Sequence, residues 1–389
     1  MGASNLDLFP ELQRQAAAYT TGILPSQSIQ ELIAAGHITA AQPILPDQIQ
    51  PSSLDLRIGP VAYRVRASFL STPNSSVATK LKEYTLYELD LTRPTVLEQG
   101  CIYIAPLMEE LWLPPGISGQ ANPKSTTGRL DVFTRLITDF GGEYREFERV
   151  VPGYKGQLYT EIGPRTFSIV VSQGTRLSQL RLRRGNPPPS GAELERLHES
   201  ETLVFNEDES PVDAIIRKKS LWLSVDLMGD ENSDIIGYKA RRNAPLIDLS
   251  RINYYETAEF WEPIRRTAAH NLVLDPHDFY ILASKEKVSI PQTVAAEMVP
   301  YDPSVGELRI HYAGFFDPGF GYGNDDIKGT KAVLEVRSHE VPFLLEDGQV
   351  VGRLIFERLL GIPDKVYGQG IGSSYQRQGL ALSKHFRRD

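Results

Sequence analysis

Hydrophobic and polar residues alternate with a period of two through most of the first half of the chain. Gly, Pro or Asn separates the alternating runs, as expected for short strands joined by turns. The runs are SSLDLRIG (52–59), CIYIAPL (101–107), DVFTRLIT (131–138), QLYTEIG (157–163), FSIVVSQ (167–173) and RLSQLRL (176–182). Many short strands with frequent turns predict a mainly β fold, a barrel or a sandwich, and not a fold of alternating strands and helices.

Two segments break this period. ILPSQSIQELIAAGHI (23–38) has the apolar spacing of a short helix, which Ser26 or Ser28 could cap. RRGNPPPSGAELERLHESE (183–201) contains three consecutive prolines, which predict an extended spacer followed by a short polar helix. This segment therefore predicts a domain boundary.

Strand patterns resume in the second half, and they repeat the first half. The runs are LWLSVDL (221–227), DFYILAS (278–284), ELRIHYAGFF (307–316), KAVLEVRS (331–338) and VVGRLIFERL (350–359). Matching residues lie at nearly constant offsets: Leu97 and Leu274, Tyr103 and Tyr280, and Pro114 and Pro291 are 177 apart, while Glu161 and Glu335, and Gly174 and Gly348, are 174 apart. Such a repeat predicts a tandem duplication of one β domain. The expected division is a first domain (1–185), a Pro-rich linker (186–215), a second domain (216–362) and a tail (363–389).

Composition excludes several classes of function. The 389 residues are 41% hydrophobic and carry a net charge of −8, which disfavours general nucleic-acid binding. No stretch approaches the roughly 20 apolar residues of a membrane span, and the first residues do not resemble a secretory signal. The lone Cys101 suits a reducing cytoplasm. Seven scattered His residues and one Cys make a zinc site improbable.

The segment NPKSTTGRLDVF (122–133) is the first candidate for chemistry. Its turn-forming Pro is followed by Lys124, Ser125, Thr126, Thr127, Gly128 and Arg129. Hydroxyls, backbone amides and two cations could together bind a phosphate chain. The spacing is not that of a P-loop. The alternative is a solvated β-turn built from ordinary turn residues.

Glu161 and Glu335 are the second candidate. Each lies in the middle of a strand among apolar neighbours, in LYTEIG and AVLEVRS. In a pocket, desolvation would raise the pKa of such a carboxyl group and suit it to general-base catalysis. On a half-exposed strand it would face solvent instead. The tail DKVYGQGIGSSYQRQGLALSKHFRRD (364–389) is the third candidate, either a frayed terminus or a lid over a ligand.

The order and spacing of these motifs resemble the 2′-deoxycytidine 5′-triphosphate (dCTP) deaminase family, which has the dUTPase-like fold, in its long two-domain form. The similar motifs are the opening helix with PSSLDLRIG, the loop KSTTGRL, the hairpins PGYKGQLYTE and DPGF…KGTKAVLE, and the tail pieces VY and YQRQG. The resemblance covers most of the chain. It implies two tandem dUTPase-like β-barrel or sandwich domains.

The resemblance also assigns roles residue by residue. Glu161 and Glu335 match the catalytic Glu, Ser125 the residue that places the attacking water, and Arg129 the Arg beside the base. The matching substrate-binding positions are Lys124, Thr126, Thr127, Gly128, Asp317, Val333, Leu334, Tyr367 and Gln378. Asp317 matches the sugar-contacting Asp, where the first half has Val151. Ser374 stands where the family has Lys, so that one phosphate-binding cation is missing or supplied from elsewhere.

The two halves divide this signature between them. The first keeps Lys124 to Arg129, and the second keeps Asp317, Glu335 and the lid. The loop of the second half reads PSVGEL, which puts Glu307 opposite Arg129, and a carboxylate there would repel a triphosphate. Sites of this family lie between subunits, so we expect a composite site made from both halves. Glu161 would then serve a second site or be a relic.

The expected reaction is hydrolysis of dCTP to dUTP and ammonia, with a glutamate base, without zinc, and with Mg²⁺ entering only as the partner of the triphosphate. The resemblance also implies a homo-oligomer, a trimer or a pseudo-symmetric equivalent. The alternatives are a dUTP pyrophosphatase, an enzyme that carries out both reactions, and a nucleotide-binding regulator without catalysis. The sequence leaves open dCTP against dCMP, which Glu is the base, and the number of sites.

Overall fold

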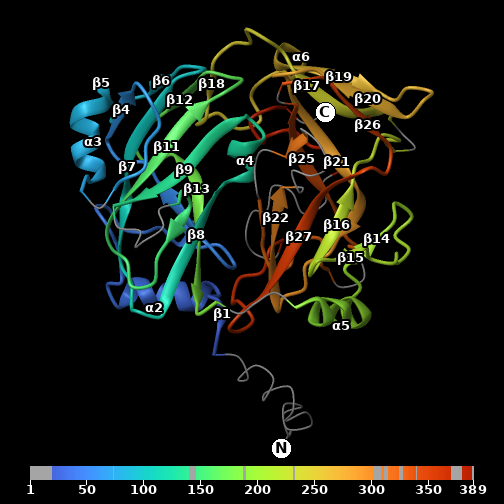
Figure 1. Ribbon diagram of the computed structural model, residues 1–389, viewed down its shortest axis with the longest axis horizontal. Coiled ribbons are helices and arrows are strands. Elements are labelled where there is room, and N and C mark those ends of the chain that lie inside the picture. The colour runs from blue at the N-terminus through green and yellow to red at the C-terminus, as the bar shows by residue number, and fades with distance from the viewer. Residues whose placement is uncertain are drawn as a thin grey trace, which may run out of the picture.

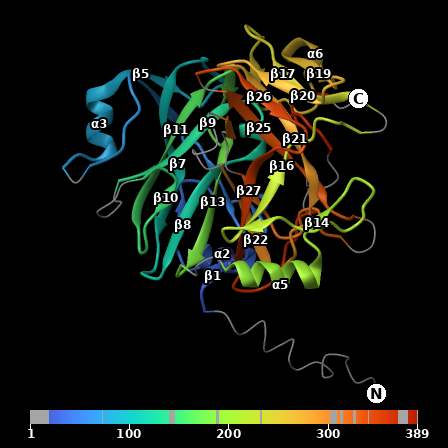
Figure 2. The same cartoon turned by 45° about the vertical axis from the view of Figure 1, so that its right-hand side comes forward.

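The computed structural model describes residues 20–387 except 73, 140–145, 187–189, 231–232, 301–307, 311–313, 324–326, 339 and 369–378. The fold is mainly β, as the period-two pattern predicts. Two β domains stand side by side, the first blue to green and the second yellow to red (Figure 1). Turned by 45°, the molecule keeps this two-part arrangement (Figure 2).

The first domain consists of two main sheets that enclose its core. One has the order β1-β13-β8-β10 with β3 beside β13, and the other has the order β5-β4-β7-β11-β9 with β2 beside β7. Its strands are β1 Gly22–Ile23, β2 Ile38–Ala40, β3 Leu54–Arg57, β4 Val61–Val65, β5 Thr85–Asp90, β6 Thr95–Leu97, β7 Ile102–Trp112, β8 Ile117–Pro123, β9 Val132–Thr138, β10 Arg149–Val150, β11 Lys155–Pro164, β12 Ile169–Val171 and β13 Arg176–Arg184. Every alternating run of the first half overlaps one of these strands.

The second domain repeats this plan. One sheet has the order β19-β17-β21-β25-β23 with β14 beside β21, and the other has the order β15-β16-β27-β22-β24. Its strands are β14 Val204–Phe205, β15 Ile216–Arg217, β16 Ser220–Ser224, β17 Ile235–Ala240, β18 Ile247–Asp248, β19 Trp261–Arg265, β20 Asn271–Leu274, β21 Phe279–Val288, β22 Val294–Pro300, β23 Leu308–Ile310, β24 Phe315–Phe316, β25 Thr330–Ser338, β26 Phe343–Glu346 and β27 Val350–Arg358.

Strand register and hydrogen bonds agree with the duplication inferred from sequence. Tyr103 is paired with Ile162 across β7 and β11, and Tyr280 is paired with Val336 across β21 and β25. The hydroxyl oxygen of Tyr103 accepts a hydrogen bond from the backbone N–H of Glu98 at 3.0 Å. That of Tyr280 accepts the same bond, at 2.9 Å, from the residue 177 positions after Glu98. The offset therefore aligns equivalent positions of two copies of one fold.

The helices are short and lie at the edges of the sheets. They are α2 Ser26–Ala34, η2 Pro46–Gln48, α3 Val77–Tyr84, α4 Ser125–Gly128, α5 Gly191–Glu201 and α6 Thr257–Phe260. The predicted capping of α2 is wrong: the N-cap is Pro25, without a side-chain cap, and Ser26 is the first helical residue. The polar helix after the prolines is α5, capped by Ser190, whose hydroxyl accepts from the N–H of Glu193. The expected linker thus contains ordered structure.

Packing does not follow the linear division of the chain. A core cluster of the first domain also contains residues of the second half, among them Ile247, Phe260, Trp261 and Phe386. β18 pairs in parallel with β12. Phe386 and β18 thus lie against the first domain, next to the seam between the two domains.

Candidate active site

The loop NPKSTTGRL forms a single helical turn between β8 and β9. Lys124 is its N-cap and Ser125–Gly128 is α4. Thr127, Gly128 and Arg129 are buried, whereas Lys124, Ser125 and Thr126 are half-buried. The alternative reading as a solvated β-turn is therefore wrong. In Figure 1, α4 lies on the side of the first domain that faces the second.

Strand β25 presents one face to this loop. Leu334 and Val336 lie in the core of the second domain, so the intervening residues Val333, Glu335 and Arg337 point to the opposite face, because side chains alternate along a strand. Val333 packs against the cluster shared with the first domain. The side chain of Leu334 thus points away from the candidate site, and only its backbone could serve substrate binding.

Glu335 and Arg129 come from different domains and interact across the seam. Glu335 is 7% exposed. Burial raises the pKa of Glu335 to about 7, although the nearby Arg129 guanidinium opposes this shift. A carboxyl group that titrates near neutrality can take up and release a proton at working pH.

A second contact across the seam lies two residues further along both segments. Arg337 donates to the Asp131 carboxylate, which is fully buried and also accepts from the hydroxyl of Thr166 at 2.5 Å. The ion pair Asp131–Arg337 therefore runs beside Arg129 and Glu335. It fixes the position of β25 relative to the loop.

Asp317 lies at the other end of the loop. Its Oδ1 accepts from the hydroxyl of Ser52 at 2.6 Å and lies 3.5 Å from Nη2 of Arg181, and both partners belong to the first domain. Burial raises the pKa of Asp317, and Arg181, the Ser52 hydroxyl and Lys124 oppose the shift. Arg181 is fully buried and also donates to the carbonyl oxygen of Ala296 at 3.0 Å.

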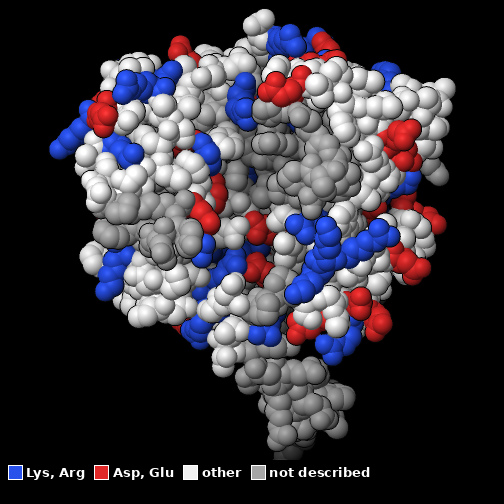
Figure 3. Space-filling view, in the orientation of Figure 1, with Lys and Arg blue, Asp and Glu red and all other residues white. Residues whose placement is uncertain are grey.

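Lys124 forms an ion pair with Asp55 on β3. Asp55 is 2% exposed, and its Oδ1 has no hydrogen-bond partner among the described residues. Asp55 also lies near Asp317, since its negative charge contributes to the raised pKa of the Asp317 carboxyl group. The loop is thus bordered by carboxylates on one side and by Glu335 on the other, and the space-filling view shows cationic and acidic side chains together along the seam (Figure 3).

Tyr367 lies beside the turn that carries Asp317. Its N–H donates to the carbonyl oxygen of Pro318 at 2.9 Å, and its ring packs on Phe320 with centroids 5.6 Å apart. Gly319 has φ +96° and its Cα faces the backbone of Tyr367, so a larger residue would clash there. The structure therefore brings Tyr367 to the candidate site. Gln378, Ser374 and Glu307 lie outside the described residues.

Glu161 occupies a different environment. Its Oε1 accepts from Nε of Arg135 at 3.0 Å, and the guanidinium of Arg135 stacks 3.7 Å from the ring centre of Phe147. This ion pair lies within the first domain, across β9 and β11. Of the two equivalent glutamates, only Glu335 shares its surroundings with the loop of α4.

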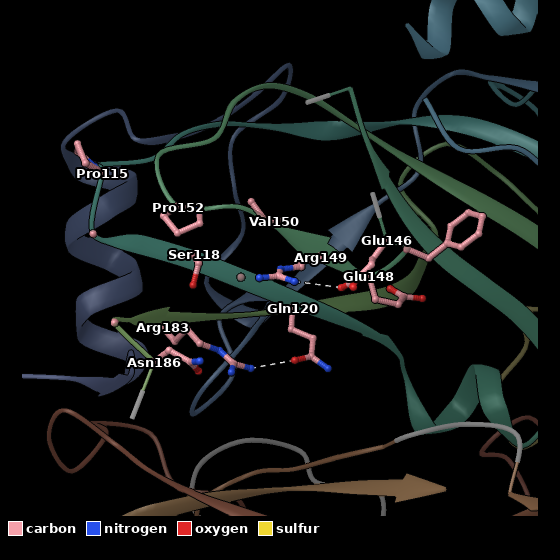
Figure 4. A pocket seen from close by; sticks show the side chains of 14 residues that line it. Pro115, Ser118, Gln120, Glu146, Glu148, Arg149, Val150, Pro152, Arg183 and Asn186 are labelled. Carbon is pink, nitrogen blue, oxygen red and sulfur yellow. Dashed lines mark hydrogen bonds and ion pairs between the residues drawn. The ribbon is translucent and has the colours of Figure 1, made fainter. Parts of the chain in front are cut away.

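A cavity of about 610 Å³ lies on the first domain, and none of the predicted site residues lines it (Figure 4). Gln120 and Val150 in its wall correspond to Glu297 and Phe316 of the second domain by the register of β8, β10, β22 and β24. Those two residues contact the first domain: Glu297 accepts from Gln120 at 2.8 Å, and the carbonyl oxygen of Phe316 accepts from Arg181. Because Gln120 itself contacts Glu297, the cavity borders the contact between the two domains.

Several residues of the site were not among the sequence predictions. Ser52 and Asp55 lie in PSSLDLRIG, and Asp131 directly follows the loop motif. Only a weak indication of these residues is present in the sequence: each is a polar or charged residue at a position of a strand or turn that is expected to be buried. In the described part of the chain, no group of three or more His, Cys, Asp or Glu could hold a metal ion. Nor does that part contain a helix long and apolar enough to cross a bilayer.

Comparison with known proteins gives consistent matches along the chain. Residues 20–186 match the model of the 2′-deoxycytidine 5′-triphosphate deaminase N-terminal domain, and residues 190–386 match that of the C-terminal domain. A solved structure of 2′-deoxycytidine 5′-triphosphate deaminase from Agrobacterium tumefaciens is 48% identical, with a TM-score of 0.84, and the match covers 91% of this chain and 100% of that chain.

Curated relatives are more distant. A protein of Halobacterium salinarum described as "dCTP deaminase, dUMP-forming" is 29% identical over 153 residues, which are 38% of this chain and 73% of the relative. One of Nocardia farcinica with the same description is 28% identical over 167 residues, which are 43% of this chain and 78% of the relative.

Proposed function

The chain belongs to the 2′-deoxycytidine 5′-triphosphate deaminase family, and we propose that it deaminates dCTP at one composite site built from both of its domains. The observation that carries this proposal is the meeting of Arg129 of the first domain with Glu335 of the second, where burial raises the pKa of Glu335 to about 7. A group of this kind is what a general base for deamination requires.

In the proposed reaction, Glu335 takes a proton from a water molecule as the water oxygen forms a bond to C4 of the cytosine. Glu335 delivers this proton to ring atom N3. It then takes the remaining proton from the new C4 hydroxyl group and passes it to the exocyclic amino group, the C4–N bond breaks as the C4 carbonyl forms, and ammonia leaves a uracil ring. Ser125 positions the water, and Arg129 stabilises the charge that develops at the ring. Each proton taken by Glu335 is returned, so the base is regenerated.

The remaining residues would bind the nucleotide. Lys124 and Thr126 lie at the half-buried end of α4, where charge-assisted hydrogen bonds to phosphate oxygens are possible. Asp317 would accept from the sugar hydroxyl, beside Tyr367, while Thr127, Gly128, Val333 and the backbone of Leu334 enclose the base. Gln378 completes the proposed set from the tail. Mg²⁺ would enter with the triphosphate as its counter-ion, since Mg²⁺ keeps several waters and binds largely through substrate phosphates.

A second candidate function is a bifunctional reaction, in which the enzyme deaminates dCTP and then also releases pyrophosphate from the dUTP that is formed. The curated relatives are described as dUMP-forming, and this description favours a bifunctional enzyme as the alternative. We also propose a cytoplasmic homo-oligomer: the lone, half-buried Cys101 suits a reducing compartment, and an oligomer is what the resemblance to the family implies.

The test is incubation with dCTP, dUTP and dCMP in the presence of Mg²⁺, with ammonia and pyrophosphate followed separately. We expect ammonia from dCTP. Equal amounts of ammonia and pyrophosphate would establish the bifunctional reaction, and ammonia alone would establish the simple deaminase. Pyrophosphate from dUTP without ammonia from dCTP would refute the proposed function.

A further inference from the structure

Arg181 reaches from β13 of the first domain into the second domain, beside the turn that carries Asp317. Its side chain is fully buried. Nη1 donates to the carbonyl oxygen of Ala296 at 3.0 Å, and Nη2 donates to that of Phe316 at 3.3 Å. The guanidinium also lies over the ring of Phe315, 3.9 Å from the ring centre. The second domain therefore holds this guanidinium in one place from several sides.

The guanidinium of Arg181 and the hydroxyl of Ser52 together face one oxygen of the Asp317 carboxylate. Nη2 of Arg181 lies 3.5 Å from Oδ1 of Asp317, and the Ser52 hydroxyl donates to the same oxygen at 2.6 Å. Nη2 of Arg181 also donates to the hydroxyl oxygen of Ser52 at 3.3 Å, which ties the two donors together. Among the described residues, none donates a hydrogen bond to Oδ2. These contacts fix the orientation of the carboxylate and leave its second oxygen to a ligand.

Arg181 also favours the ionised form of Asp317. Burial raises the pKa of Asp317, and the positive charge of Arg181 opposes this shift more than any other neighbour does. An ionised carboxylate only accepts hydrogen bonds, whereas a protonated one also donates. The sugar of dCTP has a single free hydroxyl group, at position 3′, because position 2′ is deoxy and the 5′ oxygen carries the phosphates. A carboxylate held as an acceptor suits that hydroxyl as its donor.

The two copies of the fold carry this charged pair only where its members meet. Ile355 lies 174 positions after Arg181, at the equivalent place in the strand register of the second domain. Val151 precedes the Pro-Gly of the first copy, where the second copy has Asp317. The first copy therefore keeps the cation and the second keeps the carboxylate, each with an apolar residue at the other position. A role for Arg181 within its own β domain would not explain this distribution, whereas a role toward Asp317 does.

We propose that Arg181 is a positioning residue for Asp317: together with Ser52 it orients the carboxylate so that Oδ2 accepts from the 3′-hydroxyl of the nucleotide. The inference rests on the proposed function and adds to it a residue that acts through Asp317 without touching the substrate. Loss of Arg181 should therefore weaken only those substrates that carry a 3′-hydroxyl.

The experiment measures ammonia release from dCTP and from 2′,3′-dideoxycytidine triphosphate (ddCTP), which lacks the 3′-hydroxyl. For the wild type we expect kcat/KM to be ~10- to 100-fold lower with ddCTP, the range for one hydrogen bond to a charged group. Arg181→Met should lower kcat/KM for dCTP by a similar factor and that for ddCTP less than ~3-fold. The matched control is Arg183→Met, because Arg183 lies on the same strand and pairs across the seam with Glu357 at 3.1 Å. It should keep the wild-type preference for dCTP.

Equal losses for dCTP and ddCTP in Arg181→Met would assign it a merely structural role and overturn the inference. An unchanged kcat/KM for dCTP in this variant, or a wild type that does not distinguish the two substrates, would overturn it as well. All three outcomes leave ammonia release from dCTP by the wild type, and thus the proposed function, intact, whereas absence of that release would refute both.

A second variant keeps the test decisive if Arg181→Met is poorly folded by circular dichroism. Ser52→Ala removes the other donor to Oδ1 of Asp317 without removing a charge. It should lower kcat/KM for dCTP ~3- to 10-fold, the range for one neutral hydrogen bond, and leave that for ddCTP unchanged. Equal effects of Ser52→Ala on both substrates, or no effect on either, would again overturn the inference.

Discussion

The same substitution, Glu to Gln, should have opposite effects at the two duplicated positions. Glu335 is buried and has a pKa raised to about 7. Glu161 is also buried but pairs with Arg135. We expect Glu335→Gln to abolish ammonia release and to stabilise the protein at high pH. Glu161→Gln should retain turnover and destabilise the protein.

The magnitude for Glu335 follows from linkage. Its folded pKa of about 7 lies above the ordinary value of 4.5, so the unfolded chain loses the proton first as pH rises. Stability therefore falls between pH 4.5 and pH 7, and the loss is complete above pH 7. At 1.36 kcal/mol per pKa unit, the cost of keeping Glu335 ionised is about 3 kcal/mol. Gln carries no charge, so Glu335→Gln should recover this free energy at pH 8 and almost none near pH 4.5.

For Glu161 the sign is reversed. The side chain of Glu161 is 2% exposed and that of Arg135 26%, so removing the charge leaves a partly buried guanidinium without its counter-ion. The expected loss of unfolding free energy is roughly 1–3 kcal/mol at neutral pH. Because Gln can still accept one hydrogen bond, the lower end of this range is the more realistic.

The assay is urea unfolding of the wild type and both variants at pH 5 and pH 8, followed by circular dichroism, with ammonia release measured on the same samples. If Glu335→Gln has the same effect on stability at both pH values, Glu335 is not a desolvated carboxyl group. If Glu335→Gln retains full turnover while Glu161→Gln abolishes it, the assignment of the base to the second domain is wrong.

Three further changes test the composite site. Arg129→Gln should raise the pKa of Glu335 and move the acid limb of the kcat/KM profile above pH 7, because the opposing cation is gone; an unmoved limb contradicts their proximity. Asp131→Ala, which leaves Arg337 buried and unpaired, should lower unfolding free energy by about 3–5 kcal/mol, and Arg337→Met combined with it should recover part of the loss in urea titrations. Gly319→Ala should displace the chain that follows the last strand and raise the KM for dCTP in steady-state kinetics.

Strand positions were predictable from the sequence because burial on one face of a sheet imposes a period of two. β9 and β11, for example, lie within the runs DVFTRLIT and QLYTEIG with small changes at their ends. The duplication was predictable because both copies keep the spacing of buried residues. The packing of 240–260 and 380–386 on the first domain was not, since no local pattern specifies which of two similar cores a segment will join.

The loop, both glutamates and Asp317 were identifiable by motif, but their grouping depends on how two domains dock. Asp55 and Arg181 could not be recognised in this way, because each reads as an ordinary charged residue of a strand, and only the structure shows that both are buried. Ser374 indicated only that a cation is missing.

A site shared between two domains explains why each copy could lose a different part. In the proposed composite site the loop comes from the first copy and the glutamate from the second, so selection on that site would not act on the loop of the second copy or on Glu161. The second copy's loop reads PSVGEL, without the hydroxyl run of the first, and Glu161 is neutralised by Arg135. The altered loop of the second domain and the neutralised Glu161 of the first domain are the two elements that together would form the other composite site. Restoring catalysis there would therefore require changes in both domains at once, and Arg135→Ala alone should expose Glu161 without creating a second active site.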